Sequence, residues 1–144
     1  MKIAVLIARI LLGAIFVFFG SNLMFHFLPN PPLPPGPMKD FTTVMFVTHY
    51  IEVVGFFQVA PGILLLINRY VPLALTVLAA EIVNILTFHI LVVHGGLFPL
   101  PIVTALLWLL VFWRVRSAFA GIFSARVVES TSGQAALPAS KMDS

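Results

Sequence analysis

The sequence predicts an all-α integral membrane protein, an antiparallel four-helix bundle with both termini in the cytoplasm (N-in/C-in). Hydrophobic residues make up 60% of the 144 residues and charged residues 9%, and the mean hydropathy is +1.09. A soluble domain of this length has too small an interior for that much apolar surface, so we expect lipid around the protein. The apolar residues form four runs, and the basic residues gather at the ends of these runs on one side.

The first apolar run, residues 3–27, exceeds the roughly 20 residues that cross a bilayer core. A cleaved signal peptide is disfavoured, because the run is too long, Arg9 interrupts it and no small-residue cleavage site follows. Residues 28–40 contain six prolines, which predict a stiff, extended loop before the second span.

The second run, residues 41–67, is long for one span and contains Pro61. Proline removes the helical hydrogen bond to the carbonyl four residues earlier, so we expect a single kinked span with its bend near Phe57. Two further apolar runs predict a third span at residues 72–93 and a fourth at residues 98–113.

Two regions follow the predicted transmembrane domain of residues 1–116. Residues 117–128 place three apolar side chains on one helical face, which predicts an amphipathic helix lying in the membrane interface. These side chains are Phe119, Ile122 and Phe123. Residues 129–144 are polar and show no periodicity, which is typical of a disordered tail.

The basic residues sort by membrane side. With N-in/C-in topology only Lys39 lies outside, and the remaining basic residues lie inside, as cytoplasmic loops require. The inside set is Lys2, Arg9, Arg69, Arg114, Arg116, Arg126 and Lys141. Tyr70 and Trp113 suit the aromatic belt on that side. This pattern predicts a multi-pass protein of a bacterial-type inner membrane, and the charges are too dispersed for a nucleic-acid partner.

Ionisable and amide side chains interrupt the apolar spans, where isolated charges are costly and persist mostly where they are used or paired. Counted at about 1.5 Å per residue, Glu81 lies near the midplane and the others lie in the outer half. The candidate polar site, opening outward, comprises His49, Glu52, Glu81, Asn84 and His89. Gln58 is left out, because it points away from His49.

Three uses of this polar site stay open: helix pairing, proton or ligand binding, and cofactor ligation. His49 and His89 at matched depth would allow a haem between them, although paired histidines alone are weak support. The absence of cysteine excludes a cysteine-ligated Fe–S cluster within this chain. No metal site is predicted, because the order His49-x-x-Glu52 reverses the Glu-x-x-His motif of di-iron bundles.

Small residues and one arginine mark the packing faces of the first two spans. Gly13 and Gly20 lie about 20° apart on one face of the first span, which favours close helix packing. Gly55 and Gly62 allow a close backbone approach from the second span. We expect Arg9 to extend to the interface rather than pair with a carboxylate.

Two stretches resemble the DoxX-like family of small four-helix integral membrane proteins. Residues 8–21, ARILLGAIFVFFGS, resemble the first helix of that family, and residues 61–94 resemble its second-to-third helix hairpin. The polar landmarks of the resemblance are Arg9, Gly13, Gly20, Glu52, Asn68-Arg69, Pro72, Asn84 and His89. The resemblance implies a four-helix membrane fold over residues 4–116. It also implies links to quinone-coupled sulfur oxidation or redox-defence complexes, and in distant eukaryotic relatives to cargo reception or assembly.

Three functions therefore stay open. The first is an accessory subunit of a larger membrane redox or bioenergetic electron-transfer complex, with membrane-protein partner subunits. The second is a quinone-linked oxidoreductase component that handles protons through Glu52, Glu81 and His89, with a quinone or tetrapyrrole cofactor. The third is a small transporter or assembly chaperone. We favour the accessory subunit, because the chain carries little chemistry of its own and its resemblance leans towards redox assemblies.

Overall fold

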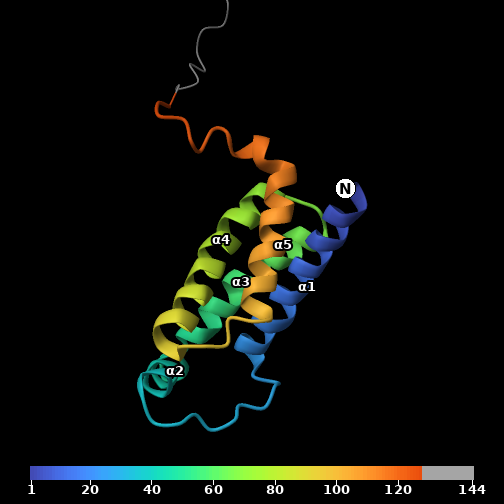
Figure 1. Cartoon of the computed structure of the whole chain (residues 1–144). Coiled ribbons are helices and arrows are strands. Elements are labelled where there is room, and N and C mark those ends of the chain that lie inside the picture. Colours follow the sequence, from blue (N-terminus) through green and yellow to red (C-terminus); the bar gives the residue numbers. More distant parts are fainter. Residues whose placement is uncertain (128–144) are drawn as a thin grey trace, which may run out of the picture.

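The structure, a computed structural model, describes residues 1–127 and contains no strand among them (Figure 1). The all-α prediction is confirmed, and the predicted tail of residues 129–144 lies outside the described residues. The helices are α1 (Lys2–Phe25), α2 (Pro37–Val47), α3 (Tyr50–Leu66), α4 (Val71–Phe88), the π-helix η1 (His89–Val93), α5 (Leu100–Val115) and the 3-10 helix η2 (Arg116–Phe119).

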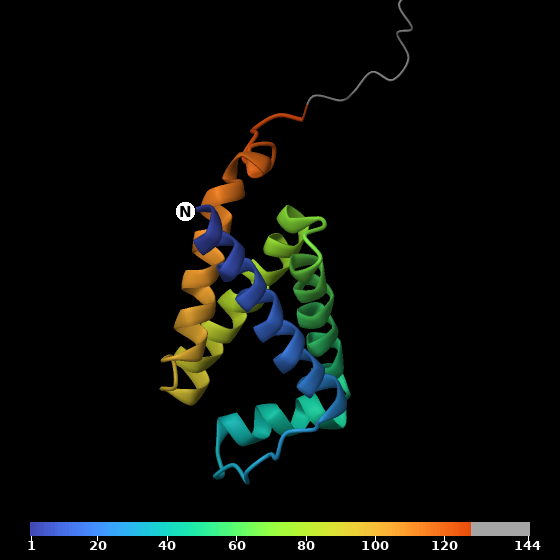
Figure 2. The same ribbon diagram turned by 90° about the vertical axis from the view of Figure 1, so that its right-hand side faces the viewer.

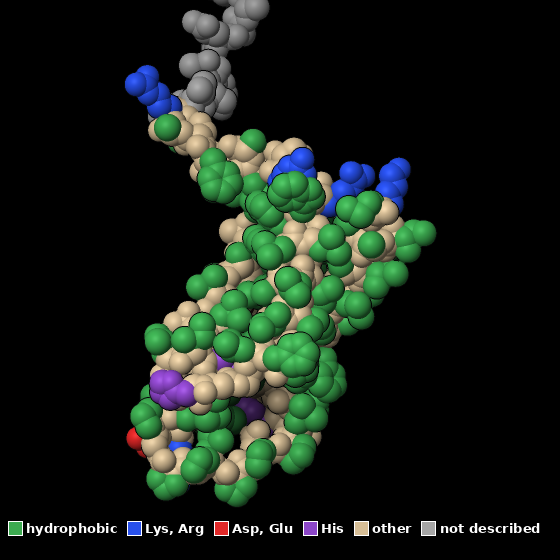
Figure 3. All heavy atoms as spheres, in the orientation of Figure 1, with side chains coloured by type: hydrophobic (Ala, Val, Ile, Leu, Met, Phe, Trp, Pro, Cys, Tyr) green, Lys and Arg blue, Asp and Glu red, His purple; other side chains and the backbone are tan. Residues whose placement is uncertain are grey.

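Several of these helices are long and apolar enough to cross a membrane. By length and composition, three segments qualify: α1, α4 extended by η1, and α5 extended by η2. The bent pair of α2 and α3 would add a fourth if it forms one span. Apolar side chains cover most of the surface along these helices (Figure 3), as expected of a multi-pass membrane protein.

The second predicted span differs in the structure. Pro61 lies inside a continuous α3, and the chain bends instead between α2 and α3, whose axes meet at 83°. At this break the Thr48 hydroxyl donates to the Val44 carbonyl at 2.7 Å, and His49 adopts a left-handed φ of 59°. Side-chain bonding of this kind competes with the helical ladder, and a left-handed residue ends it.

Four helices lie side by side, and α2 lies across one end of them (Figure 2). Both α1 and α4 contact the same two neighbours, α3 and α5, so the four helices close around a shared core. The fully buried side chains of this core are Leu12, Leu65, Leu75, Leu78 and Val111. Trp108 of α5 adds a directional contact, because its indole Nε1 donates to the Leu75 carbonyl of α4 at 2.8 Å.

Glycines bring α1 and α3 into backbone contact. A Cβ built on Gly13 would lie 2.8 Å from the carbonyl oxygen of Gly62. A Cβ on Gly55 would lie 2.6 Å from the carbonyl oxygen of Gly20. Side chains of any size are therefore excluded at these crossings, as in other membrane helix pairs that pack through small residues.

Arg9 also joins α1 to α3, near the C-terminal end of α3. Its Nη1 donates to the carbonyl oxygen of Leu65 at 2.6 Å. Leu65 lies in the last turn of α3, where its carbonyl also accepts from the Asn68 N–H at 3.3 Å and where a cation is favourable. Arg9 therefore caps a neighbouring helix, which differs from the predicted extension to the interface.

The segment after α5 also differs from its prediction. Instead of an amphipathic helix over residues 117–128, the short η2 ends at Phe119 and turns follow it through the described residues. The Phe119 side chain is buried and its ring lies 5.0 Å from that of Phe112, whereas Ile122 and Phe123 are exposed. Phe119 therefore packs into the core and does not share one exposed face with Ile122 and Phe123, contrary to what the helical period predicts.

Candidate functional site

A cavity of about 390 Å³ lies between α2, α3 and α4. Its volume falls within the range of about 300–1,000 Å³ that is usual for small-molecule sites. The wall is mostly apolar and aromatic, with a few polar side chains, which is also the usual composition of such sites. The lining residues are Leu23, Phe41, Met45, Tyr50, Val54, Gln58, Glu81, Asn84, Ile85, Phe88 and His89.

One stripe of α4 supplies half of the polar lining. Glu81 and Asn84 are three residues apart and Phe88 follows four residues later, so all three project from one face of the helix. The α-helix then gives way to a π-helix, which begins at His89. Such π turns inside α-helical segments occur frequently at functional sites.

The ring of His89 is held in one tautomer. Its Nδ1 lies 2.8 Å from the carbonyl oxygen of Ile85. A carbonyl oxygen only accepts hydrogen bonds, so Nδ1 carries a proton, and in the neutral imidazole Nε2 is then the acceptor. His89 thus brings to the cavity wall an imidazole that can accept a hydrogen bond or a proton.

Gln58 reaches the same cavity from α3, although the helical period predicts that it points away from the site. Its side chain is buried, and its Nε2 donates to Oε2 of Glu81 at 3.5 Å, a long hydrogen bond. His49 and Gln58 do differ by about 180° around the helix. The buried face of α3 is the face that carries Gln58, however, and not the face of His49. The signal that would have found it is the heptad spacing of Gly55 and Gly62 around Gln58.

His49 and Glu52 form a second polar group outside the cavity wall. His49 Nδ1 lies 2.8 Å from Glu52 Oε1, and His26 Nε2 lies 3.9 Å from the same oxygen. These three side chains gather where α1 ends and where α2 meets α3. The predicted five-residue site therefore separates into Glu81, Asn84 and His89 around the cavity, and His49 with Glu52 at the bend.

This separation decides which cofactors the residues fit. The side chain of His49 is 76% exposed and bonded to Glu52, so His49 and His89 do not flank the cavity as a pair of haem ligands. No group of three His, Asp or Glu side chains suited to a metal ion occurs in residues 1–127. The cavity wall instead combines aromatic side chains with amide donors, and the rings of Phe41 and Phe88 contact each other there with their centroids 5.4 Å apart.

Comparison of the chain with models of protein families, with curated proteins and with solved structures gave no match. The resemblance of residues 8–21 and 61–94 to DoxX-like proteins therefore stays a prediction. The proposed function therefore rests on the geometry of the cavity.

Proposed function

We propose that the chain is a DoxX-like protein of a bacterial-type inner membrane that binds an amphipathic ligand of the quinone class in the cavity between α2, α3 and α4. It would act as the membrane component of a quinone-linked redox system. The observation that carries this proposal is the cavity itself, where aromatic side chains and a carboxyl, two amides and an imidazole share one wall.

The polar lining suits a quinone head group. The amide nitrogens of Gln58 and Asn84 are donors, and the carbonyl oxygens of a quinone are acceptors. Glu81 and His89 can each hold or release a proton beside them. A bound quinone would supply the electron-accepting group. The protein's own contribution is to orient the ring, to exclude water and to move protons at Glu81 and His89.

We further propose that α1, α3, α4 and α5 are the four spans of an antiparallel bundle with both termini in the cytoplasm. In this topology α2 lies along the outer surface. α3 has 17 residues, about 25 Å of helix, which is near the lower limit for a span. Support comes from the contacts of α1 and α4 with the same two neighbours and from Lys and Arg side chains that gather at one end (Figure 3). The cavity would then open towards the outer side.

The test is quinone content after purification in mild detergent. Wild type should retain quinone, and Asn84→Leu, which removes a donor from the cavity wall, should retain much less. Glu52→Gln is the matched control, because it alters a carboxylate outside the cavity and should leave the content unchanged. Wild-type protein without quinone, or equal loss in both variants, would remove the cavity from the proposal.

An accessory role in a larger redox complex is the second candidate, and α2 favours it. This helix has no buried residue and exposes three apolar side chains, Phe41, Val44 and Val47. A partner subunit in the membrane interface would cover such a helix. Native purification with mass spectrometry of co-migrating proteins tests this role, and deletion of the apolar side chains of α2 should release the partner. The transporter and chaperone hypotheses stay predictions without a specific observation in their favour.

A further inference from the structure

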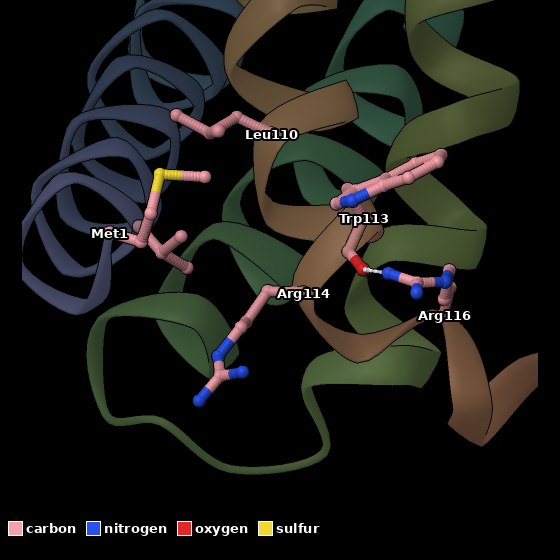
Figure 4. A pocket seen from close by; sticks show the side chains of 6 residues that line it. Met1, Leu110, Trp113, Arg114 and Arg116 are labelled. Carbon is pink, nitrogen blue, oxygen red and sulfur yellow. Dashed lines mark hydrogen bonds between the residues drawn. The ribbon is translucent and has the colours of Figure 1, made fainter.

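A second cavity, of about 270 Å³, lies between the start of α1 and the end of α5 (Figure 4). One part of its wall is apolar and is formed by Met1, Val5 and Leu110. The other part is formed by Trp113, Arg114 and Arg116. The cavity therefore joins an apolar surface to a basic rim at the end of the molecule where the chain begins.

The two arginines of this rim differ in how they are held. The Nη1 of Arg116 donates to the Trp113 carbonyl at 2.7 Å, and its guanidinium carbon lies 4.5 Å from the centre of the Trp113 ring. Stacking and bonding of this kind fix the direction of a guanidinium and leave its other donors free. The Arg114 side chain extends away from Trp113 and Arg116 (Figure 4), and it has no hydrogen-bond or ion-pair partner among residues 1–127.

Acidic side chains that would neutralise this rim lie elsewhere in the described part of the chain. Asp40 is on α2, Glu52 is in the first turn of α3, and Glu81 is in the middle of α4. Figure 3 shows most of the visible Lys and Arg side chains at one end, and the visible acidic atoms near the other end, where some basic atoms also lie. The rim of the cavity therefore carries two guanidinium groups without an acidic partner among residues 1–127, and guanidinium groups favour anions with several acceptor oxygens.

We propose that this cavity binds one anionic phospholipid. Its head-group phosphate would lie at the basic rim that Arg114 and Arg116 line, and its acyl chain would begin along Val5 and Leu110. A lipid accounts for both halves of the wall, whereas a free phosphate would leave the apolar half without a role. Trp113, 64% exposed, suits the level of the head groups, and basic pockets between membrane helices are typical head-group sites.

The test uses the full chain, purified in mild detergent and delipidated, then titrated with phosphatidylglycerol or phosphatidylcholine and followed by native mass spectrometry. We expect one phosphatidylglycerol to bind more tightly than phosphatidylcholine. Arg114→Gln and Arg116→Gln should each weaken the phosphatidylglycerol binding about fivefold and leave phosphatidylcholine unchanged. Arg69→Gln is the matched control, since it removes one charge from the turn between α3 and α4, which does not line the cavity, and should change neither lipid.

Three outcomes would overturn the proposal: equal affinity for the two lipids, an equal loss in Arg69→Gln, or full competition by inorganic phosphate, which would indicate a site for free anions. If an arginine variant does not fold, Val5→Trp serves instead, because it fills the apolar half and keeps both charges. Loss of the bound lipid in Val5→Trp supports the proposal, and its retention contradicts it.

Discussion

Among single residues, Glu81 most directly tests whether the cavity handles protons. Glu81→Gln keeps the shape of the side chain and its capacity to bond Gln58, but it removes the ionisable group. We therefore expect normal folding and retained quinone. Proton uptake that accompanies chemical reduction of the bound quinone should slow about a hundredfold, the lower range for loss of a general acid or base.

The measurement is stopped-flow with a pH indicator, together with thermal unfolding in detergent. Glu52→Gln is the control, because its carboxylate bonds His49 at the bend and does not line the cavity. His89→Gln should also slow the uptake. If the Glu81, Glu52 and His89 variants all match wild type in ligand content and rate, the polar residues serve helix packing alone.

Arg9 supports a second prediction at the residue scale. Its bond to the Leu65 carbonyl joins α1 to the last turn of α3, and hydrogen bonds of charged groups contribute about 1.5–3 kcal/mol. Arg9→Leu should therefore lower the free energy of unfolding by about that amount, measured by thermal and denaturant unfolding in detergent. Arg9→Lys should recover part of the loss, since a lysine also donates to carbonyls. An unchanged stability in Arg9→Leu would show that the bond contributes little.

Among the helices, the pairing of α1 with α3 depends on glycine. Gly55→Ala would place a methyl group 2.6 Å from the Gly20 carbonyl oxygen, so the two backbones must separate. Overpacking of this kind costs about 1–3 kcal/mol, and we expect a matching loss in thermal stability. Gly95→Ala is the control, because no atom lies within 4 Å of its added methyl group. Equal stability of the two variants would contradict the close backbone contact.

The helices differ in how far the sequence predicts them. α1, α4 and α5 follow from length and hydropathy, because a long apolar run has few alternatives to a helix in lipid. The bend before α3 cannot be predicted from length and hydropathy. It depends on a hydrogen bond from the Thr48 hydroxyl to the Val44 carbonyl and on the left-handed conformation of His49. Pro61 predicts a kink near Phe57, but α3 is a continuous helix through Pro61, which lies on its buried face.

The candidate site, like the helices, could be predicted from the sequence only in part. Polar residues on one helix, such as Glu81 and Asn84, could be grouped from the helical period alone. Residues of different helices could not be grouped in this way, because their contacts depend on which face of α3 is buried. That face carries Gly55, Gln58 and Gly62, and it turns Glu52 towards His49 and His26 instead of the cavity.

At the scale of the whole molecule, the two ends differ in charge and in shape. Most of the described Lys and Arg side chains lie at the end where α1 begins and α5 ends, and α2, which carries Lys39, closes the other end (Figures 2 and 3). If the basic end is cytoplasmic, the quinone cavity opens outward and the lipid cavity faces the inner leaflet. The orientation in the membrane thus fixes the side from which each proposed ligand enters.

A reporter that is active only outside the cytoplasm measures this orientation. Inserted after Gly36 it should be active, and fused after Ser144 it should be inactive. Gly36 is a suitable insertion point, because no atom lies within 4 Å of a Cβ built there and it precedes α2 without a side-chain cap. The opposite pattern would place the basic end outside, and both proposed ligands would then have to enter from the other side. Activity at both positions would mean that an even number of spans separates Gly36 from Ser144, so that α3, α4 and α5 do not all cross the membrane.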